Sequence, residues 1–184
     1  GKSTLLRALA GIYPLAAGDM TVVGRIGTLL DIGLGFEGES TGRENIYYRG
    51  MTMGYSRKQL RAVEEEIVKF ADLGDFIDLP MRTYSAGMVV RLGCAVSTQC
   101  HADILLVDEV FGAGDAAFSR LALARMMAMV NNSGIFVVAT HDLAMVQNVC
   151  SRVIWLDRGA IVRDGLPSSV IPDYIRYMAG DTAI

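Results

Sequence analysis

Two short apolar runs in the second half of the chain constrain the fold more than any other feature. ADILLVDEV (102–110) and IFVVATHD (135–142) each contain a continuous apolar stretch, ILLV and IFVVA, that is followed directly by polar residues. Runs of this kind are typical of parallel strands that are buried on both faces. A helical pattern at 115–134 lies between them, and another follows at 142–151. This alternation predicts an α/β fold with a mainly parallel sheet covered by helices.

The other elements are predicted from local patterns. Residues 20–30 are β-branched and punctuated by glycine, which favours a few short antiparallel strands. Ser56 is expected to be a helix N-cap, and Gly11 is expected to end the first helix. Further predictions are helices at 2–14, 41–54, 56–74, 85–99 and 172–180, and a hairpin at 152–165 that turns at Asp157-Arg158-Gly159.

The helical stretch interrupts the alternation of strands and helices. We therefore expect residues from about 41 to 99 to form an inserted helical subdomain. Residues 1–40 and 100–184 would then form the core of one domain. No internal repeat or low-complexity tract suggests any other division of the 184 residues.

Composition limits the classes of function. The formal net charge is −3, which argues against nucleic acid as the main partner. Cys94, Cys100 and Cys150 show no C-x-x-C spacing, which favours reduced, mostly buried thiols in a cytosolic protein. No apolar run approaches the roughly 18 residues of a membrane span, and the start does not resemble a signal peptide. We expect a soluble domain whose connection to a membrane runs through a partner.

The chain begins with Gly1-Lys2-Ser3-Thr4, the end of the phosphate-binding pattern G-x-x-x-x-G-K-[ST]. A lysine at this position can bridge the β- and γ-phosphates of a nucleotide, and the next hydroxyl can coordinate Mg²⁺. Free amides at the start of a helix add donors for anions. An ordinary helix start is the alternative, and these four residues alone do not separate the two.

Two acids end the first apolar run. The carboxyl edge of a parallel sheet is where such sheets bind ligands, and Asp108-Glu109 would lie there. Asp108 can hold the Mg²⁺ shell, and Glu109 can orient and deprotonate a water that attacks the γ-phosphate. The alternative is a buried strand followed by acids in a loop, but the GKST sequence favours the functional interpretation.

Two further positions could contact phosphate. His141 ends the second apolar run and can donate a hydrogen bond to a γ-phosphate oxygen, although a lone strand-end histidine is more often structural. Ser85 and Gly87 begin a helix, where a hydroxyl, an amide and the helix dipole can bind an anion. A plain N-cap is the alternative for Ser85. A second anion site suits a second subunit's nucleotide.

The order of these motifs resembles the ATP-binding subunit of ABC transporters over essentially the whole chain. The resemblance implies a P-loop NTPase fold that binds ATP and Mg²⁺. It also implies the following roles: Gly1, Lys2, Ser3 and Thr4 close the Walker A loop, Ser85 and Gly87 belong to the signature motif, Asp108 is the Walker B aspartate, Glu109 the catalytic glutamate, Asp115 the D-loop aspartate and His141 the switch histidine.

Departures from the family pattern point to one branch. Tyr84, Ala86 and Met88 replace the usual Leu, Gly and Gln of the signature. Together with LLDIGLGFEGESTGREN and DEVFGAGDAAF, this signature resembles exporters of lipid-linked polysaccharides such as O-antigen, capsule or teichoic acid. The usual Q-loop glutamine is absent, because residues 31–37 offer only acids as polar side chains. No residue is assigned that contact.

The resemblance also implies partners. Two copies would pair head to tail, so that each ATP meets Lys2 and its companions from one copy and Ser85 and Gly87 from the other. A membrane-spanning subunit would dock near the helical lobe, at the cytoplasmic face of the inner or plasma membrane. The family's leading strand, first loop glycine and adenine-stacking aromatic lie upstream of Gly1. These 184 residues alone are therefore expected to be N-terminally truncated and to bind and hydrolyse ATP weakly.

Three other functions are alternatives to this interpretation. The chain could be the ATPase of another transporter. It could also be a non-transport ABC ATPase acting on DNA or ribosomes, but these usually carry a long coiled-coil insertion or a basic arm, and the chain shows neither. A regulatory module with an inactive site is a third possibility, against which the retained Lys2, Asp108, Glu109 and His141 argue.

Overall fold

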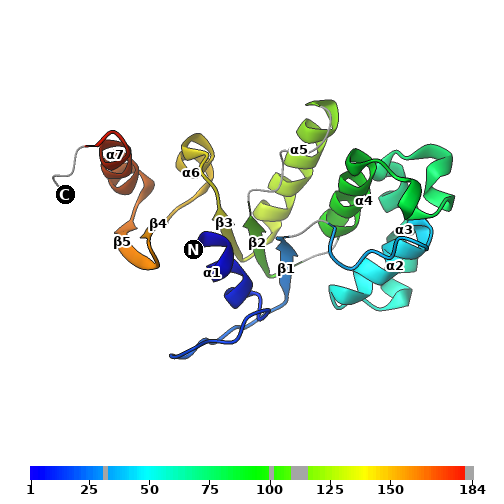
Figure 1. Ribbon diagram of the computed structural model, residues 1–184, viewed down its shortest axis with the longest axis horizontal. Coiled ribbons are helices and arrows are strands. Elements are labelled where there is room, and N and C mark those ends of the chain that lie inside the picture. Colours follow the sequence, from blue (N-terminus) through cyan, green and yellow to red (C-terminus); the bar gives the residue numbers. More distant parts are fainter. Residues whose placement is uncertain (31–32, 100–101, 109–115, 181–184) are drawn as a thin grey trace. The chain divides into compact units, whose positions relative to one another are not determined.

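The computed structural model describes residues 1–30, 33–99, 102–108 and 116–180 (Figure 1). The chain divides into two compact units. The terminal unit comprises Gly1–Tyr13 and Ala139–Ile184, and the central unit comprises Pro14–Val138.

The terminal unit combines three helices with a hairpin. The helices are α1 (Lys2–Leu9), α6 (Leu143–Val149) and α7 (Pro167–Met178), and the antiparallel strands are β4 (Val153–Asp157) and β5 (Ala160–Gly165). Trp155 of β4 is buried, and its ring meets the rings of Tyr174 and Tyr177 at centroid distances of 5.4 and 4.9 Å. This aromatic cluster joins α7 to the hairpin.

The predicted hairpin is confirmed. Arg158 and Gly159 both have positive φ, 46° and 86°, as the two central residues of a type I′ turn require. The end of α1 also matches its prediction. Gly11 has a φ of 72°, and the Ile12 amide donates to the Arg7 carbonyl at 2.9 Å, which closes a Schellman cap.

The predicted start of the last helix is wrong. The predicted start is Pro172, but α7 begins at Pro167. Both prolines suit the first turn of a helix, where no intrahelical acceptor is needed. The structure uses the earlier one and keeps Pro172 inside the helix.

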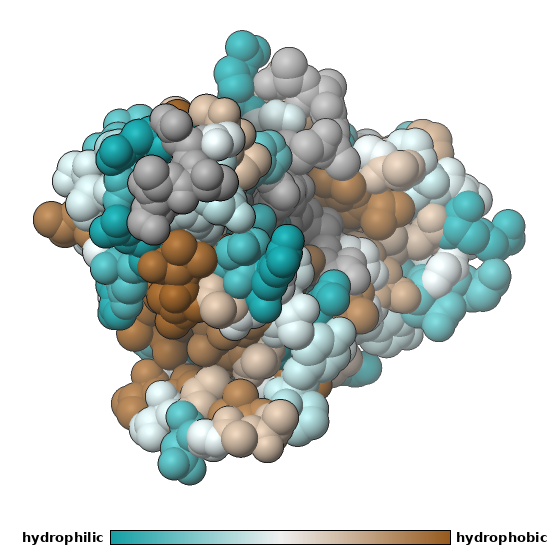
Figure 2. Space-filling model, turned by 60° about the vertical axis from the view of Figure 1, so that its left-hand side comes forward, coloured by the Kyte–Doolittle hydropathy of each residue, from teal (hydrophilic) through white to brown (hydrophobic). Residues whose placement is uncertain are grey.

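Apolar side chains remain exposed on the hairpin and α7: Ile154, Ile161, Val162, Leu166, Ile175 and Met178. Apolar patches among polar surface are visible on the face of the molecule that Figure 2 draws. Within the described residues of β4, only Trp155 is buried. The hairpin therefore depends mainly on its own ladder and on the aromatic cluster.

The sheet of the central unit has the order β1-β2-β3. Its strands are β1 (Ile26–Leu29), β2 (Ile104–Asp108) and β3 (Ile135–Ala139). β1 and β2 are parallel, with Ile26 opposite Ile104 and Leu29 opposite Val107. The two apolar runs therefore form neighbouring strands, as predicted.

The predicted antiparallel strands at 20–30 are wrong. Only β1 forms there, and it pairs in parallel with β2. Residues 20–25 form no strand, and the side chain of Val23 is 84% exposed. β-branched residues favour strands because their side chains pack well on a half-buried sheet, and not because their backbone prefers the strand conformation by itself. Without a neighbouring strand among the described residues, that composition produces no ladder here.

The helical bundle comprises residues 42–99. It contains α2 (Gly42–Thr52), α3 (Arg57–Ala71), α4 (Ala86–Gln99) and two short 3₁₀ helices, η1 (Gly74–Asp78) and η2 (Met81–Thr83). Its buried core includes Ile46, Ile67, Ala71, Leu92 and Val96, all fully buried. The bundle therefore has a core of its own.

Capping boxes begin two of these helices. The Thr41 hydroxyl accepts from the Glu44 amide at 3.2 Å, and the Glu44 carboxylate accepts from the Thr41 amide at 2.8 Å. Ser56 and Gln59 form the same reciprocal pair at the start of α3. The predicted Ser56 cap is thus confirmed, and each box satisfies two amides that the helix leaves free.

Helix α5 (Ala116–Asn132) packs on the bundle through rings and guanidinium groups. The Phe118 ring lies 5.6 Å from the Phe70 ring, and the Arg125 guanidinium lies 4.2 Å above Phe70. Nearby, Cys94 is buried, and its burial raises the pKa of this thiol to about 11. Cys150 is half-buried, and Cys100 lies outside the described residues.

Within the part of the chain that the structure describes, no helix has the length and apolar character needed to cross a membrane.

Candidate functional site

The GKST sequence lies at the start of α1. The helix begins at Lys2, and its first intrahelical bond runs from the Leu5 amide to the Gly1 carbonyl at 2.9 Å. The amides of Lys2, Ser3 and Thr4 therefore precede the helical ladder and have no acceptor within it. Lys2 and Thr4 are exposed and Ser3 is half-buried, so this helix start is open to a ligand.

His141 belongs to the same compact unit as the GKST sequence. It lies between the end of β3 and the start of α6, and it is exposed. Asp142 is the N-cap of α6, since its carboxylate accepts from the Met145 amide at 3.0 Å. The Asp142 amide in turn donates to the Thr140 hydroxyl at 3.0 Å. These bonds fix the backbone on the C-terminal side of His141.

Asp108 ends β2 in the central unit, as predicted, and is half-buried. It directly follows Val107, whose register partner on β1 is Leu29. The chain therefore leaves β1 at the same edge of the sheet at which Asp108 lies. Glu109 and Asp115 lie outside the described residues.

Ser85 and Gly87 begin α4, as predicted. The Ser85 hydroxyl accepts a hydrogen bond from the Met88 amide at 3.2 Å, so it already acts as an N-cap. A Cβ placed on Gly87 would meet only the Ser85 hydroxyl within 4 Å. Ser85 is exposed and Gly87 is half-buried. The start of α4 thus has free space around the Gly87 backbone and an exposed hydroxyl at Ser85.

The described site residues fall into two groups. Lys2, Ser3, Thr4 and His141 belong to the terminal unit, and Asp108, Ser85 and Gly87 belong to the central unit. In the first group, Lys2, Ser3 and Thr4 lie at a free helix start, and His141 precedes α6. The second supplies a carboxylate at a sheet edge and a second free helix start.

These residues fit a nucleotide and a divalent ion in their chemistry. The free amides and Lys2 suit phosphate oxygens. Among the residues described, no group of three or more His, Cys, Asp and Glu side chains could hold a metal ion by itself. Mg²⁺ is commonly held by one or two carboxylates together with water and substrate phosphates, and the Asp108 carboxylate and the Ser3 hydroxyl are each, taken alone, oxygen ligands of the kind that it binds.

A cavity of about 200 Å³ in the central unit lies elsewhere. Its lining includes Ala102, Leu105, Arg125 and Ser133. Ala102 and Leu105 lie at the amino end of β2, whereas ligands of parallel sheets bind at the carboxyl end, where Asp108 lies. The cavity is therefore separate from the candidate site.

Two buried polar residues of α2 were missed from the sequence. Asn45 and Arg49 are 0% and 4% exposed. They stand four residues apart, so they share a face of the helix with each other and alternate with the buried Ile46 and Gly50. A helix that buries polar and small residues has no apolar stripe, which removes the usual signal for its buried face.

Residues 1–112 match the protein family described as ABC transporter. The chain is 45% identical over 174 residues to the O-antigen export system ATP-binding protein RfbB of Myxococcus xanthus, covering 95% of this chain and 40% of that protein. It is 43% identical over 166 residues to the O-antigen export system ATP-binding protein RfbE of Yersinia enterocolitica, covering 90% and 70%.

A more distant relative is the teichoic acids export ATP-binding protein TagH of Enterococcus faecalis, 32% identical over 178 residues. The alignment covers 97% of this chain and 40% of that protein. The chain thus spans two fifths of the length of two of these three relatives.

The fold is similar to that of solved cassettes. A dimeric ATP-binding cassette bound to ADP and Pi aligns with a TM-score of 0.71 at 20% identity, covering 91% of this chain and 81% of that one. The predicted α/β fold of the P-loop NTPase class, with a parallel sheet and antiparallel strands, is confirmed. The family match and the relatives together establish that this chain belongs to the ABC transporter family.

Proposed function

We propose that the complete protein is the ATP-binding and ATP-hydrolysing subunit of an exporter of lipid-linked polysaccharide. The cargo would be of the O-antigen, capsule or teichoic acid type and would cross the inner or plasma membrane through a separate membrane subunit. The observation that carries this proposal is the 43–45% identity to O-antigen export ATP-binding proteins over at least 90% of the chain. The chain would work at the cytoplasmic face of that membrane.

The start of α1 would bind the phosphates of ATP. Gly1, Lys2, Ser3 and Thr4 would surround them, because their amides precede the helical ladder and Lys2 is exposed. The Ser3 hydroxyl and the Asp108 carboxylate would hold Mg²⁺. When bound, Mg²⁺ supplies positive charge that stabilises the charge developing on the phosphate oxygens.

Two residues would act in hydrolysis. Glu109 would accept a proton from the attacking water, since it directly follows the strand end at Asp108. His141 would donate a hydrogen bond to a phosphate oxygen. The caps around Asp142, which fix the backbone after His141, support a role that requires a defined position.

A second copy of the chain would complete the site. Ser85 and Gly87 of one copy would meet the phosphates bound by Lys2 of the other, with Asp115 at the contact between copies. The open start of α4 supports this arrangement, because it offers donors that a single nucleotide site does not need. ATP would then join the two copies, and its hydrolysis would release them.

We also propose the division of labour within the chain. Residues 1–40 and 100–184 would form the nucleotide-binding core, and residues 41–99 would form the helical subdomain. The separate buried core of the helical bundle supports that subdomain. The membrane subunit would dock near residues 31–43, where the chain passes from the sheet to α2.

The Glu109→Gln variant of the complete protein tests the chemistry. Loss of a general base is expected to lower the ATPase rate by about 10²–10⁴-fold. Glu65→Gln is the matched control, because Glu65 is an exposed acid of the bundle that pairs with Arg43 at 3.0 Å. Turnover of ATP by Glu109→Gln at the parent rate would show that Glu109 is not the base.

Sedimentation of the same variant tests the dimer. With ATP and Mg²⁺ present, Glu109→Gln should accumulate as a dimer, because it retains the nucleotide that joins the copies. A Ser85→Ala, Gly87→Asp double variant should stay monomeric, since it removes the proposed donors and adds a like charge. A strictly monomeric Glu109→Gln protein would contradict the paired site.

Expression of Glu109→Gln in the host tests the cargo. An inactive exporter should leave lipid-linked glycan on the cytoplasmic side, and its composition identifies the transported polysaccharide. Normal surface glycan in a strain that carries only the variant would contradict a role in polysaccharide export.

A further inference from the structure

Arg49 is a buried cation at the centre of the helical bundle. It is 4% exposed and belongs to α2. Its Nε and Nη2 atoms donate to the Ser97 hydroxyl of α4 at 3.1 and 2.9 Å, and Ser97 is itself 1% exposed. Its Nη1 atom donates to the backbone carbonyl of Leu34. One guanidinium therefore joins α4 to the chain that precedes α2.

The chain from residue 33 to 41, here called the connecting segment, is held closely against α2. The Phe36 ring lies 5.5 Å from the Arg49 guanidinium. Gly35 has a φ of 85°, and a Cβ there would approach the Thr52 hydroxyl to 3.2 Å. The Asn45 side chain accepts from the Glu37 amide at 2.7 Å and donates to the Glu37 carbonyl at 2.9 Å.

The connecting segment lies in the chain between the sheet edge at Asp108 and the helical bundle. It follows β1, which leaves the sheet at the edge where Asp108 ends the neighbouring strand. α4 begins directly after Ser85 and carries Ser97 near its other end. Arg49 thus contacts the connecting segment, which comes from the sheet edge where Asp108 lies, and it also contacts α4, the helix that begins after Ser85.

An arginine is an unusual residue for the buried position 49. Removing a charge from water is expensive, and well-packed apolar side chains would fill the same space at lower cost. An arginine offers five donors in a planar fork, so it can bond a hydroxyl and a carbonyl in different directions at once. A lysine in this position could not reproduce that geometry.

We propose that Arg49 is a positioning residue that fastens the connecting segment to α4, so that the sheet edge at Asp108 and the helix start at Ser85 move together during the ATPase cycle. The catalytic consequence rests on the proposed ATPase function, whereas the fastening itself does not. Arg49 touches no reacting group. It acts by keeping two parts of the paired site in a fixed relation.

Kinetics of the complete protein with its membrane subunit test the consequence. Arg49→Met should lower kcat for ATP about tenfold with KM changed less than about twofold, because misplaced groups lower the rate more than ground-state binding. Ser97→Ala removes one acceptor and should lower kcat about threefold. Arg49→Lys keeps the charge without the fork and should behave like Arg49→Met; full activity in that variant would overturn the proposal.

Arg61→Met is the matched control. Arg61 is an exposed arginine of α3 in the same bundle, and it lies outside residues 31–43, where the membrane subunit is proposed to dock. Its kcat should stay within about twofold of the parent. If Arg49→Met and the core variant Ile46→Ala lost kcat in the same proportion to their loss of Tm, Arg49 would be an ordinary structural residue and the proposal would fail.

Amide hydrogen exchange without nucleotide tests the fastening independently of activity. In Arg49→Met and in the milder Ser97→Ala, the amides of residues 33–36 should exchange about tenfold or more faster, while Arg61→Met leaves them at the parent rate. Unchanged exchange in both variants would overturn the proposal. If the parent itself hydrolysed no ATP, the proposed function would fail, and exchange would still decide whether Arg49 fastens the segment.

Discussion

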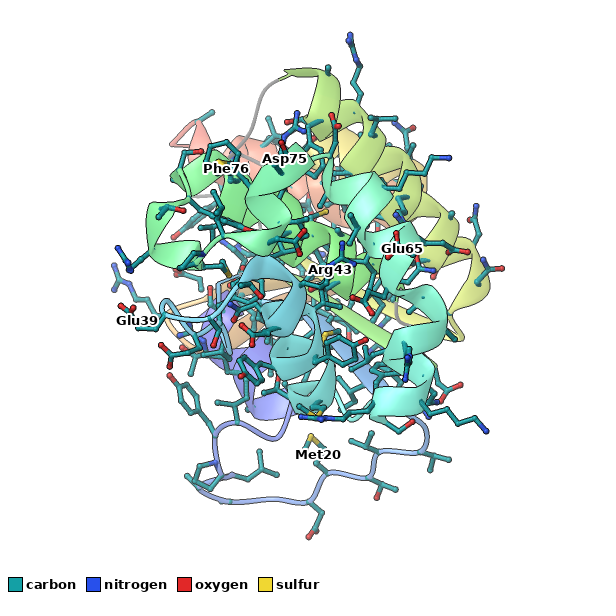
Figure 3. All side chains as sticks on the ribbon, turned by 90° about the vertical axis from the view of Figure 1, so that its right-hand side faces the viewer. Met20, Glu39, Arg43, Glu65, Asp75 and Phe76 are labelled. Carbon is teal, nitrogen blue, oxygen red and sulfur yellow. The ribbon has the colours of Figure 1, made fainter. Side chains whose placement is uncertain are left out.

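The helical bundle and the extended segment at residues 12–25 contain similar apolar residues and fold very differently. In the bundle, Ile46 and Ile67 are fully buried, and capping boxes begin α2 and α3. In the extended segment, Ile12 and Val23 are 51% and 84% exposed, and no strand forms at 20–25. Figure 3 shows Met20 on this segment and Arg43 and Glu65 on the bundle.

The difference lies in where each region finds its partners. The caps of a helix are two or three residues from the groups that they satisfy, so the start of a helix is specified locally. A strand needs the amides and carbonyls of another strand, which can be distant in sequence. Before Gly24, the extended segment has no such ladder among the described residues. After it, the Arg25 amide donates to the Asp103 carboxylate at 2.7 Å, and β1 begins at the next residue, Ile26.

Truncation of a core side chain should give the largest contrast between the two regions. Ile46→Ala removes a fully buried side chain and should lower the free energy of unfolding by about 2–5 kcal/mol. Val23→Ala removes a mostly exposed one and should change it by less than about 0.5 kcal/mol. Denaturant unfolding of both variants measures the difference. Equal losses would show that the extended segment is also packed in solution.

A methyl group added inside the helical bundle should give the next largest change in the free energy of unfolding. At Gly42 a Cβ would lie 2.1 Å from the Tyr84 hydroxyl oxygen and 3.0 Å from the Ile77 carbonyl oxygen. Gly42→Ala should therefore lower the free energy of unfolding by about 1–3 kcal/mol through overpacking.

Gly38→Ala is the control for this substitution, because its nearest neighbour, the Arg82 Cβ, is 4.0 Å from the added Cβ. Its unfolding free energy should stay within about 0.5 kcal/mol of the parent. A stable Gly42→Ala protein would mean that Tyr84 can move aside, and loss of its hydrogen bond to the Phe76 carbonyl would then be visible in a new structure.

The same contrast explains which parts of the fold could be predicted. Ser56 is a cap whose partner Gln59 is three residues away, and the turn at Arg158 and Gly159 needs only positive φ at two adjacent residues. Both predictions are confirmed. The direction of β1 depends on Ile104, far along the chain, and the predicted antiparallel pairing was wrong.

The site divides in the same way. The helix starts at Lys2 and Ser85 and the strand end at Asp108 follow from local patterns, and the structure has them where they were predicted. Arg49 was missed because its acceptors, Leu34 and Ser97, lie on other elements. No pattern within α2 marks an arginine for burial when its partners are supplied by tertiary structure.

Removal of a cap should cost less than either core change. Thr41→Ala deletes the hydroxyl that accepts from the Glu44 amide and should lower the free energy of unfolding by about 1 kcal/mol. Thr21→Ala in the extended segment is the matched control and should have almost no effect, since Thr21 is exposed and caps no helix. Thermal unfolding of the two variants compares them. A loss at Thr21 equal to that at Thr41 would contradict a locally specified bundle.

The smallest change in stability is expected in the hairpin, where β4 and β5 form an antiparallel ladder. Arg152 donates to both carboxylate oxygens of Asp164 at 2.7 and 2.6 Å, which joins the start of β4 to β5. These hydrogen bonds lower the pKa of Asp164 from its usual value of 3.8. Because both side chains are in solvent, the pair should stabilise the fold less than any group above.

The pH dependence follows from that lowered pKa. The folded state binds the Asp164 proton less readily than the unfolded state, so the stabilisation is present above the unfolded pKa of 3.8 and is lost as pH falls through the lower folded value. The Tm difference between the parent and Arg152→Met should therefore be largest near neutral pH and should shrink below about pH 4. A difference that stays constant with pH would mean that Arg152 supports the hairpin through packing of its aliphatic stem and not through its charge.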